Sequence, residues 1–183
     1  MIILGVDPGT LFTGFAVING VNEKLELLNC DVIKIPSKNS LPLRLKLIYD
    51  SLVDVIESFK PDEFAIETAF YGKNVQSTLK LGHARGVSIL AAVNKEIPTT
   101  EYSPREVKKS VTGRGSASKE QVKYMICSIL KIKPETPMQS DISDAIAVAI
   151  CHHYKMISGT SKRKSLSWEE YVSKNPGKVK FRQ

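Results

Sequence analysis

Acidic side chains stand at two points in this sequence where a carboxylate follows a short apolar run. Asp7 comes after Ile2–Val6, and Glu67 comes after Phe64–Ile66. A carboxylate in such a setting is costly to bury unless it is paired or binds a cation. Ligands of open α/β sheets bind at the ends of strands. An Asp before Pro-Gly also forms turns, so the interpretation of Asp7 as a functional residue depends on the other acids.

A third acidic position is the start of an apolar helix, where Asp141 and Asp144 lie three residues apart. Residues at this spacing project from one helix face, within roughly 60° of each other at about 100° per residue. Acidic residues at a helix start also complement the helix dipole, and Asp141 could do only that. Because residues 145–150 are all apolar, the helix is expected to be buried almost all round. Both acids are then expected to face a site.

Four carboxylates that converge would repel one another and raise their pKa values unless a cation neutralised them. Oxygen-only ligand sets select hard ions, so Mg²⁺ is the expected occupant and Mn²⁺ could substitute. Two such ions can activate a water and stabilise the leaving oxygen of a phosphodiester. We therefore expect Asp7, Glu67, Asp141 and Asp144 to hold divalent cations at one site, where a pair of ions could act on a phosphodiester.

Histidines and cysteines offer no competing arrangement for nucleophilic catalysis. His83, His152 and His153 are scattered or near a helix end, so we expect them to pack or to face solvent. The 3 cysteines lack Cys-x-x-Cys spacing and are expected to be reduced thiols in the core.

The bulk composition favours a polyanionic partner. The chain has 183 residues, a formal net charge of +7 and a pI near 9.3. Lysine and arginine side chains that bind phosphates release the counterions of a nucleic acid, which favours binding. The excess of basic residues could instead reflect only the C-terminal tail. No apolar run approaches the length of a membrane span, and the N-terminus is too short for a signal-peptide core. These patterns predict a cytoplasmic protein with no membrane partner.

The pattern of elements predicts an α/β fold with a mixed five-stranded sheet flanked by helices, the first three strands antiparallel. Asn19-Gly20 is a hairpin signal, and Ser118 with Gln121 is a plausible capping box. The expected strands are 2–6, 14–18, 24–35, 63–68 and 99–102, and the expected helices are 42–59, 75–94, one from 104, one from 118 to about 130, and 141–156.

Two regions are expected along the chain. Residues 1–158 would form the catalytic domain, and residues 159–183 would form a basic tail with a short amphipathic helix at Trp168 and Tyr171. The tail could add non-specific DNA affinity or could dock onto the body, and the sequence does not decide between these.

Several motifs together resemble the RuvC family of bacterial Holliday junction resolvases. They occur in the family's order over residues 1 to about 155, and they are Ile3–Thr10 with Thr13-Gly14, Ile66–Phe70, Leu79–Gly86, Val107–Lys109 with Gly115–Val122, and Asp141–Ala147. One such motif alone would be weak evidence for the family, but the five together are strong evidence. The resemblance implies an RNase H-like fold and a homodimer. The implied function is an endonuclease in DNA recombination and repair that nicks strands of like polarity at a four-way junction. The branch-migration complex RuvA–RuvB is the implied partner.

The resemblance also assigns roles to individual residues. It makes the four acids the metal-binding catalytic set, and it matches Phe70 to an aromatic that stacks on opened bases. Phe70 could instead be a core residue. Lys108 and Lys119 match residues that contact DNA near the scissile phosphate, and Arg114 is a further expected DNA contact. The lysines could equally be solvated surface residues. The helix from Val75, rich in small residues, could supply the dimer contact or pack on its own sheet.

Three other functions fit parts of the pattern. An actin-like or sugar-kinase-like ATPase also opens with a strand, an Asp, a Gly and a Thr, but such proteins need two domains and usually twice this length. A non-catalytic junction-binding protein would lack one of the acids, and none is missing here. Another RNase H-like nuclease acting on a different structured nucleic acid would keep all four acids. Only substrate assays therefore distinguish it from a junction resolvase.

Overall fold

A computed structural model describes residues 1–22, 24–68, 74–133 and 136–160 of the chain. In chain order the elements are β1 (Ile2–Asp7), β2 (Phe12–Val21), β3 (Lys24–Lys34), α1 (Leu41–Phe59), β4 (Glu63–Glu67), α2 (Val75–Val93), β5 (Thr99–Tyr102), α3 (Pro104–Thr112), α4 (Lys119–Leu130) and α5 (Ser140–Thr160). The expected order of elements is confirmed, and most ends agree within two residues. The predictions for Phe70, Trp168 and Tyr171 concern residues outside the described ranges.

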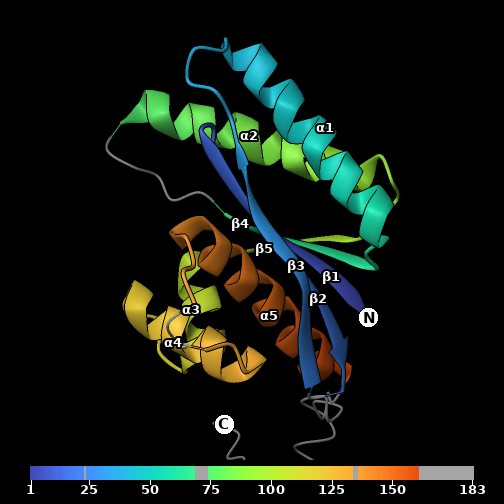
Figure 1. Cartoon of the computed structure of the whole chain (residues 1–183), viewed down its shortest axis with the longest axis vertical. Helices are drawn as coiled ribbons and strands as arrows, with labels where there is room; N and C mark the ends of the chain where they lie inside the picture. Colours follow the sequence, from blue (N-terminus) through green and yellow to red (C-terminus); the bar gives the residue numbers. More distant parts are fainter. Residues whose placement is uncertain (23, 69–73, 134–135, 161–183) are drawn as a thin grey trace, which may run out of the picture.

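The strands form one mixed sheet in the order β3-β2-β1-β4-β5 (Figure 1). β1 pairs antiparallel with β2, and β2 pairs antiparallel with β3. β4 runs parallel to β1, and β5 runs parallel to β4. The expected mixed sheet, with its first three strands antiparallel, is therefore confirmed. This order places β1 at the centre, where its carboxyl end lies beside that of β4.

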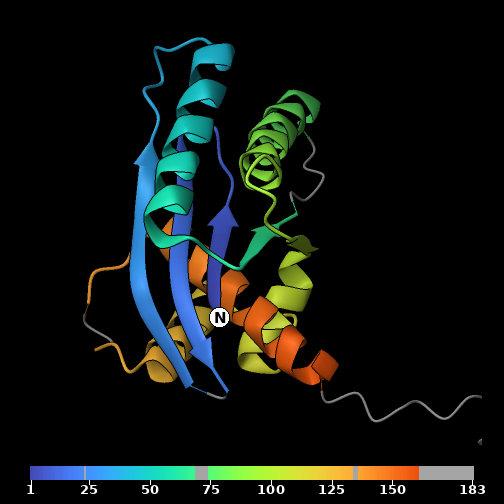
Figure 2. The same cartoon turned by 90° about the vertical axis from the view of Figure 1, so that its right-hand side faces the viewer.

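Helices cover both faces of the sheet. α1 and α2 lie on one face, and α3, α4 and α5 lie on the other (Figures 1 and 2). Side chains of β1 alternate between the two sides, because successive residues of a strand point to opposite faces. Leu4 and Val6 pack in the core beneath α1 and α2, whereas Ile3 packs in the core beneath α5. Of the described helices, none has the length and apolar character that crossing a bilayer requires.

Two capping boxes fix the starts of α3 and α4. The Ser103 hydroxyl accepts a hydrogen bond from the backbone N–H of Glu106, whose side chain accepts one from the Ser103 backbone N–H. Ser118 and Gln121 make the same reciprocal pair at α4, as expected from the sequence. Each box satisfies backbone donors that the first helical turn leaves unpaired. The first residue of α4, Lys119, is thus held in a defined place.

The hairpin expected at Asn19-Gly20 is wrong in position. Both residues lie inside β2, paired with Glu26 and Leu25, and the chain turns later, at Asn22, which has a positive φ of 55°. Gly20 serves packing instead, because a Cβ there would lie 2.2 Å from Nδ1 of His153. The glycine therefore marks a close approach of α5 to the sheet, which is the other common meaning of a glycine in a strand.

The expectation that the histidines serve packing or face solvent is confirmed. His152 is buried with its Nδ1 3.0 Å from the hydroxyl of Tyr102. His153 is buried with its Nε2 2.9 Å from the backbone oxygen of Asn22. His83 is exposed on α2. The cysteines are free, as expected, and Cys127 and Cys151 are buried.

Candidate active site

Asp7 and Glu67 occupy equivalent positions at the ends of two neighbouring parallel strands. Val6 of β1 pairs with Ile66 of β4, so the next residue of each strand carries its carboxylate at the same edge of the sheet. The flanking apolar residues anchor both strands in the core, since Val6 and Ile66 have no exposed surface. The sheet register therefore brings together two acids that lie 60 residues apart in the sequence.

Glycines allow α5 to bring its acids to the same edge. A Cβ on Gly14 would lie 2.0 Å from the backbone oxygen of Asp141, and one on Gly5 would lie 2.4 Å from the backbone oxygen of Ala145. Gly14 is the β2 partner of Asp7. The first turn of α5 therefore rests directly on the strand beside Asp7, at a distance that no side chain on Gly14 would permit.

Three of the four predicted acids line one cavity of about 300 Å³. Asp7, Glu67 and Asp141 contribute to its wall, whose other residues are Pro8, Gly9, Phe12, Thr68, Leu81 and Pro104. Asp144 lies one helical turn after Asp141 and is partly buried. The cavity wall thus combines carboxylates with apolar groups.

The electrostatics show that the four acids act on one another. Burial raises the pKa of Asp7 to about 7, and the charges of Asp144 and Asp141 contribute to that rise. Burial likewise raises the pKa of Glu67 to about 8, with further contributions from Asp7 and Asp144. Repulsion between carboxylates and loss of solvation both disfavour the charged forms. The cluster therefore favours any cation that can enter it.

Lys119 supplies part of that positive charge from the chain itself. Its Nζ lies 2.9 Å from Oδ2 of Asp144 and donates a hydrogen bond of 2.9 Å to Oγ of Ser140. The Ser140 hydroxyl in turn donates to Oδ2 of Asp144 at 3.4 Å. The hydrogen bond to Asp144 raises the pKa of Lys119, and the charges of Asp7 and Glu67 add to the rise. Lys119, placed by the sequence near the reacting centre, therefore contacts the acid cluster directly.

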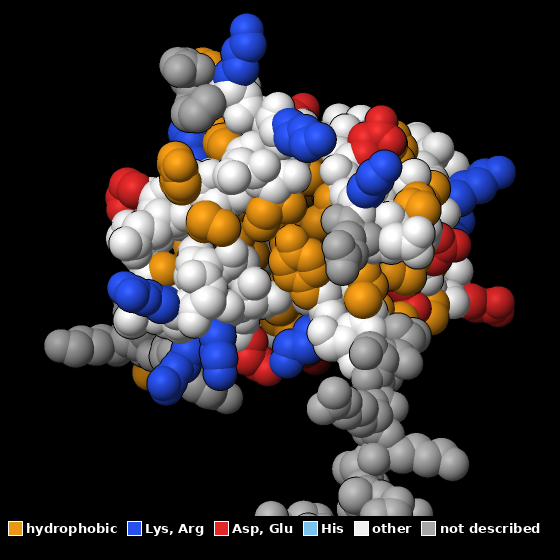
Figure 3. Space-filling model, turned by 90° about the horizontal axis from the view of Figure 1, so that it is seen from below, with side chains coloured by type: hydrophobic (Ala, Val, Ile, Leu, Met, Phe, Trp, Pro, Cys, Tyr) orange, Lys and Arg blue, Asp and Glu red, His pale blue; other side chains and the backbone are white. Residues whose placement is uncertain are grey.

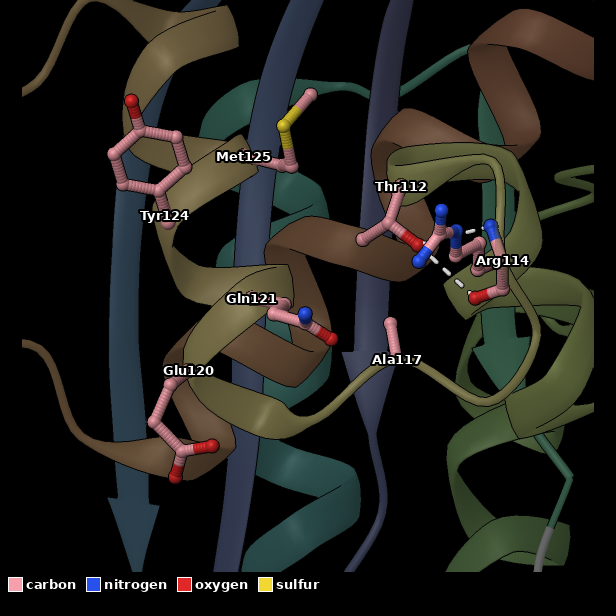
Figure 4. Close-up of a pocket in the computed structure, with 7 residues that line it drawn as sticks. All are labelled: Thr112, Arg114, Ala117, Glu120, Gln121, Tyr124 and Met125. Carbon is pink, nitrogen blue, oxygen red and sulfur yellow. Dashed lines mark hydrogen bonds between the residues drawn. The ribbon is translucent and has the colours of Figure 1, made fainter.

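The other basic residues expected at the site take different places. The positive charge of Lys108, on α3, opposes the rise in the pKa of Glu67, so Lys108 also lies near the acids. Arg114 does not line the acid cavity. It lines a separate hollow of about 660 Å³ beside α4, together with Gln121 and Tyr124 (Figure 4). Viewed from below, lysine and arginine side chains stand around the edge of a central hydrophobic area (Figure 3).

The donor set fits a hard divalent cation in its chemistry and charge, but not as a preformed shell. All four acids offer oxygen, the ligand that Mg²⁺ and Mn²⁺ prefer. Within the described ranges, however, no three His, Cys, Asp or Glu side chains are arranged as a metal-binding group. Asp144 is instead engaged by Lys119. A cation would therefore draw the carboxylates together and compete with this lysine.

The sequence analysis missed two contributors to this site. Phe12 lines the acid cavity, and its only sequence signal was an aromatic residue close to Asp7. Ser140 bridges Lys119 and Asp144, and its signal was a hydroxyl residue just before Asp141. Neither signal is specific, because the contacts join parts of the chain far apart in sequence.

Comparisons with known proteins bear on the family and the fold of the chain. A family model described as "Crossover junction endodeoxyribonuclease RuvC" matches residues 3–152. A RuvC from Chloroherpeton thalassium is 48% identical over 182 residues, covering 96% of this chain and 97% of that protein. The structure of Thermus thermophilus RuvC in complex with a Holliday junction substrate is 32% identical, with a TM-score of 0.82, covering 87% of this chain and 97% of that one.

A more distant likeness bears on the fold alone. The yeast mitochondrial Holliday junction resolvase Ydc2 is 15% identical, with a TM-score of 0.66, covering 88% of this chain and 81% of that one. With the sheet order, these likenesses confirm the RNase H-like α/β fold expected from the sequence.

Proposed function

The chain belongs to the family of RuvC crossover junction endodeoxyribonucleases, and we propose that it resolves Holliday junctions with Asp7, Glu67, Asp141 and Asp144 as its catalytic acids. One observation carries the assignment of the acids. Carboxylates from the ends of two parallel strands and from the start of α5 line a single cavity. Burial, with a smaller contribution from neighbouring carboxylates, raises the pKa values of Asp7 and Glu67. Strand ends are where open α/β sheets bind their ligands.

The proposed substrate is four-way junction DNA. The Thermus relative binds a Holliday junction substrate, and the chain has the charge that such a partner requires. Residues 104–131, which include α3 and α4, carry seven Lys or Arg and only two Glu. Phosphate contacts from such a segment would supply most of the affinity and make it fall with salt. We propose paired nicks in strands of like polarity.

The proposed metal is Mg²⁺, with Mn²⁺ as a substitute and two ions per site. Asp7, Glu67 and Asp141 would hold the ions from the cavity wall, with Asp144 beside them. Divalent cations supply an activated water and stabilise the leaving oxygen in phosphodiester hydrolysis. Lys119 holds Asp144 in place through its ion pair. On entry of a cation, Lys119 would be released to contact the DNA backbone near the cut.

The remaining DNA contacts are proposed from charge and position. Lys108 lies near Glu67 and would bind a phosphate close to the scissile one. Arg114 lies further away, in the hollow beside α4, and would bind a more distant phosphate. Phe70 follows Glu67 by three residues and would stack on bases opened at the crossover.

A homodimer is the proposed assembly, because two sites are needed to nick two strands in one event. α2 presents large apolar side chains to solvent, and these are Val75, Leu79, Leu90 and Val93. On the same helix a Cβ at Gly82 or Gly86 would meet nothing within 4 Å, so another helix could approach closely. We propose α2 as the dimer contact. The RuvA–RuvB complex is proposed as the partner that moves the junction.

The test is cleavage of a mobile four-way junction by the purified protein. We expect nicked strands in Mg²⁺, none in EDTA, and no cutting of a linear duplex that carries the same sequence. Equal cutting of the linear duplex would contradict the junction assignment. Faster cutting of another structured nucleic acid would favour the alternative of a different RNase H-like nuclease.

A further inference from the structure

Phe12, at the start of β2, presents an aromatic ring to solvent in the cavity that contains the acids. Its relative exposure is 50%, and it lines the same cavity as Asp7, Glu67 and Asp141. Large aromatic side chains in a strand normally bury their surface. Ligand pockets are typically lined by apolar and aromatic side chains beside a few polar groups, so an exposed ring in the wall of this cavity is available to pack against a ligand.

The backbone around Phe12 is held firmly. A Cβ on Gly9 would lie 2.1 Å from the backbone oxygen of Phe12, so the two segments are in direct contact. The fully buried Thr13 accepts a hydrogen bond from the Gly9 N–H at 3.2 Å and donates one to the Gly9 oxygen at 2.7 Å. The Ile35 N–H donates to the Leu11 oxygen at 2.9 Å. The ring is therefore attached at a fixed point beside Asp7.

The cavity wall combines two kinds of group. It contains the carboxylates of Asp7, Glu67 and Asp141 together with the apolar side chains of Phe12 and Leu81. A nucleotide has the same division, because its phosphate is anionic while the faces of its base and sugar are apolar. A phosphate directed by cations toward the acids would leave its own sugar and base next to Phe12. The two kinds of group in the cavity wall thus match the two kinds of group in one nucleotide of a DNA strand.

We propose that Phe12 packs against the sugar or base of the nucleotide adjoining the scissile phosphate and holds that phosphate in position for cleavage. This inference rests on the proposed function, since it takes the acid cavity to be the cutting site. Contact between an aromatic ring and a base tolerates any sequence, so Phe12 could take this role at any cleavage sequence. Its role would be to set the position of the strand, and it would contribute little to overall affinity. The affinity comes chiefly from phosphate contacts elsewhere.

Phe12→Ala tests the proposal, with Val21→Ala as the matched control. Val21 ends the same strand at its other end and is 57% exposed. We expect Phe12→Ala to lower the rate of junction cleavage at saturating protein by roughly tenfold, because the scissile phosphate is then held less precisely for reaction. Its junction Kd and its half-saturating Mg²⁺ concentration should stay within twofold of wild type. Phe12→Leu should recover part of the rate, and Val21→Ala should cut like wild type.

A second measurement identifies the contact directly. A photoreactive benzoylphenylalanine at position 12 should crosslink to the cut strand within one nucleotide of the scissile phosphate, and the same group at position 21 should not. An abasic site at that nucleotide separates the two contacts. If Phe12 meets the base, the abasic junction abolishes the difference between wild type and Phe12→Ala. If it meets the sugar, the difference persists.

The inference and the proposed function fail in different ways. Cleavage by Phe12→Ala within twofold of wild type, or crosslinking confined to DNA far from the cut, overturns the role of Phe12 while leaving the junction resolvase intact. Failure of the wild-type protein to cut a junction at all would overturn the proposed function itself. Thermal melting of each variant shows whether a lower rate reflects a loss of folded protein.

Discussion

Asp7→Asn should make the metal-free protein more stable, because the native carboxylate is held in an unfavourable place. The pKa of Asp7 is raised from 3.8 to about 7, chiefly by burial and then by the charges of Asp144 and Asp141. The folded state therefore binds a proton more tightly than the unfolded state does. Between about pH 4 and pH 7, stability falls as pH rises, because ionising Asp7 costs more in the folded protein than in the unfolded one.

The size of the effect follows from that shift. At 1.36 kcal/mol per pKa unit, the full shift corresponds to about 4 kcal/mol above pH 7. The cavity is open to solvent and can relax, so we expect a gain of about 1–3 kcal/mol. For a chain of this size each kcal/mol corresponds to about 2–4 °C in Tm. Removal of the Asp7 charge also lowers the pKa of Glu67, because Asp7 is the neighbour whose charge raises that pKa most.

Thermal melts in EDTA at pH 8 and at pH 4 are the assay. Asp7→Asn should melt several degrees above wild type at pH 8, and the difference should vanish at pH 4, where the carboxyl is protonated. Asp54→Asn, an exposed position on α1, is the control and should show no such pH dependence. Mg²⁺ should stabilise wild type and should stabilise Asp7→Asn much less. A variant that is less stable than wild type at pH 8 in EDTA would refute the reasoning.

Three further outcomes follow from the same contacts. Gly14→Ala should destabilise the protein by about 1–3 kcal/mol or more in urea melts, because its Cβ would lie 2.0 Å from the backbone oxygen of Asp141; an unchanged midpoint would show that α5 moves freely. Lys119→Ala should lower the Tm in EDTA at pH 8, opposite in sign to Asp7→Asn, because it removes the cation paired with Asp144, whereas exposed Lys38→Ala should not. Junction affinity should fall steeply between low and moderate salt in binding titrations, and a flat response would contradict phosphate-dominated binding.

Sequence reasoning located the acids because strand ends and helix starts are local features. The apolar runs before Asp7 and Glu67 predicted strands, and the sheet confirms both. The capping pair of Ser118 and Gln121 was likewise visible within one helical turn. What remained beyond the sequence was how far apart the oxygens lie, because that depends on side-chain positions across three elements. No described group is preassembled for a metal.

Contacts between distant segments were the part that the sequence could not supply. The ion pair of Lys119 and Asp144 joins residues 25 positions apart, and no periodic pattern encodes it. Gly20 was misassigned because a glycine after an asparagine favours a hairpin turn, whereas here it makes room for His153. A glycine in a strand signals close approach, but only the fold shows what approaches.

The most direct test of the central claim is junction cleavage by Asp7→Asn in Mg²⁺, measured beside its binding to the same junction. If the acid cluster is the cutting site, the variant should bind the junction as wild type does, or more tightly, and its cleavage rate should fall by at least about a thousandfold, or about 4 kcal/mol in activation free energy. Cleavage by this folded variant at the wild-type rate would contradict the claim that these acids perform the reaction.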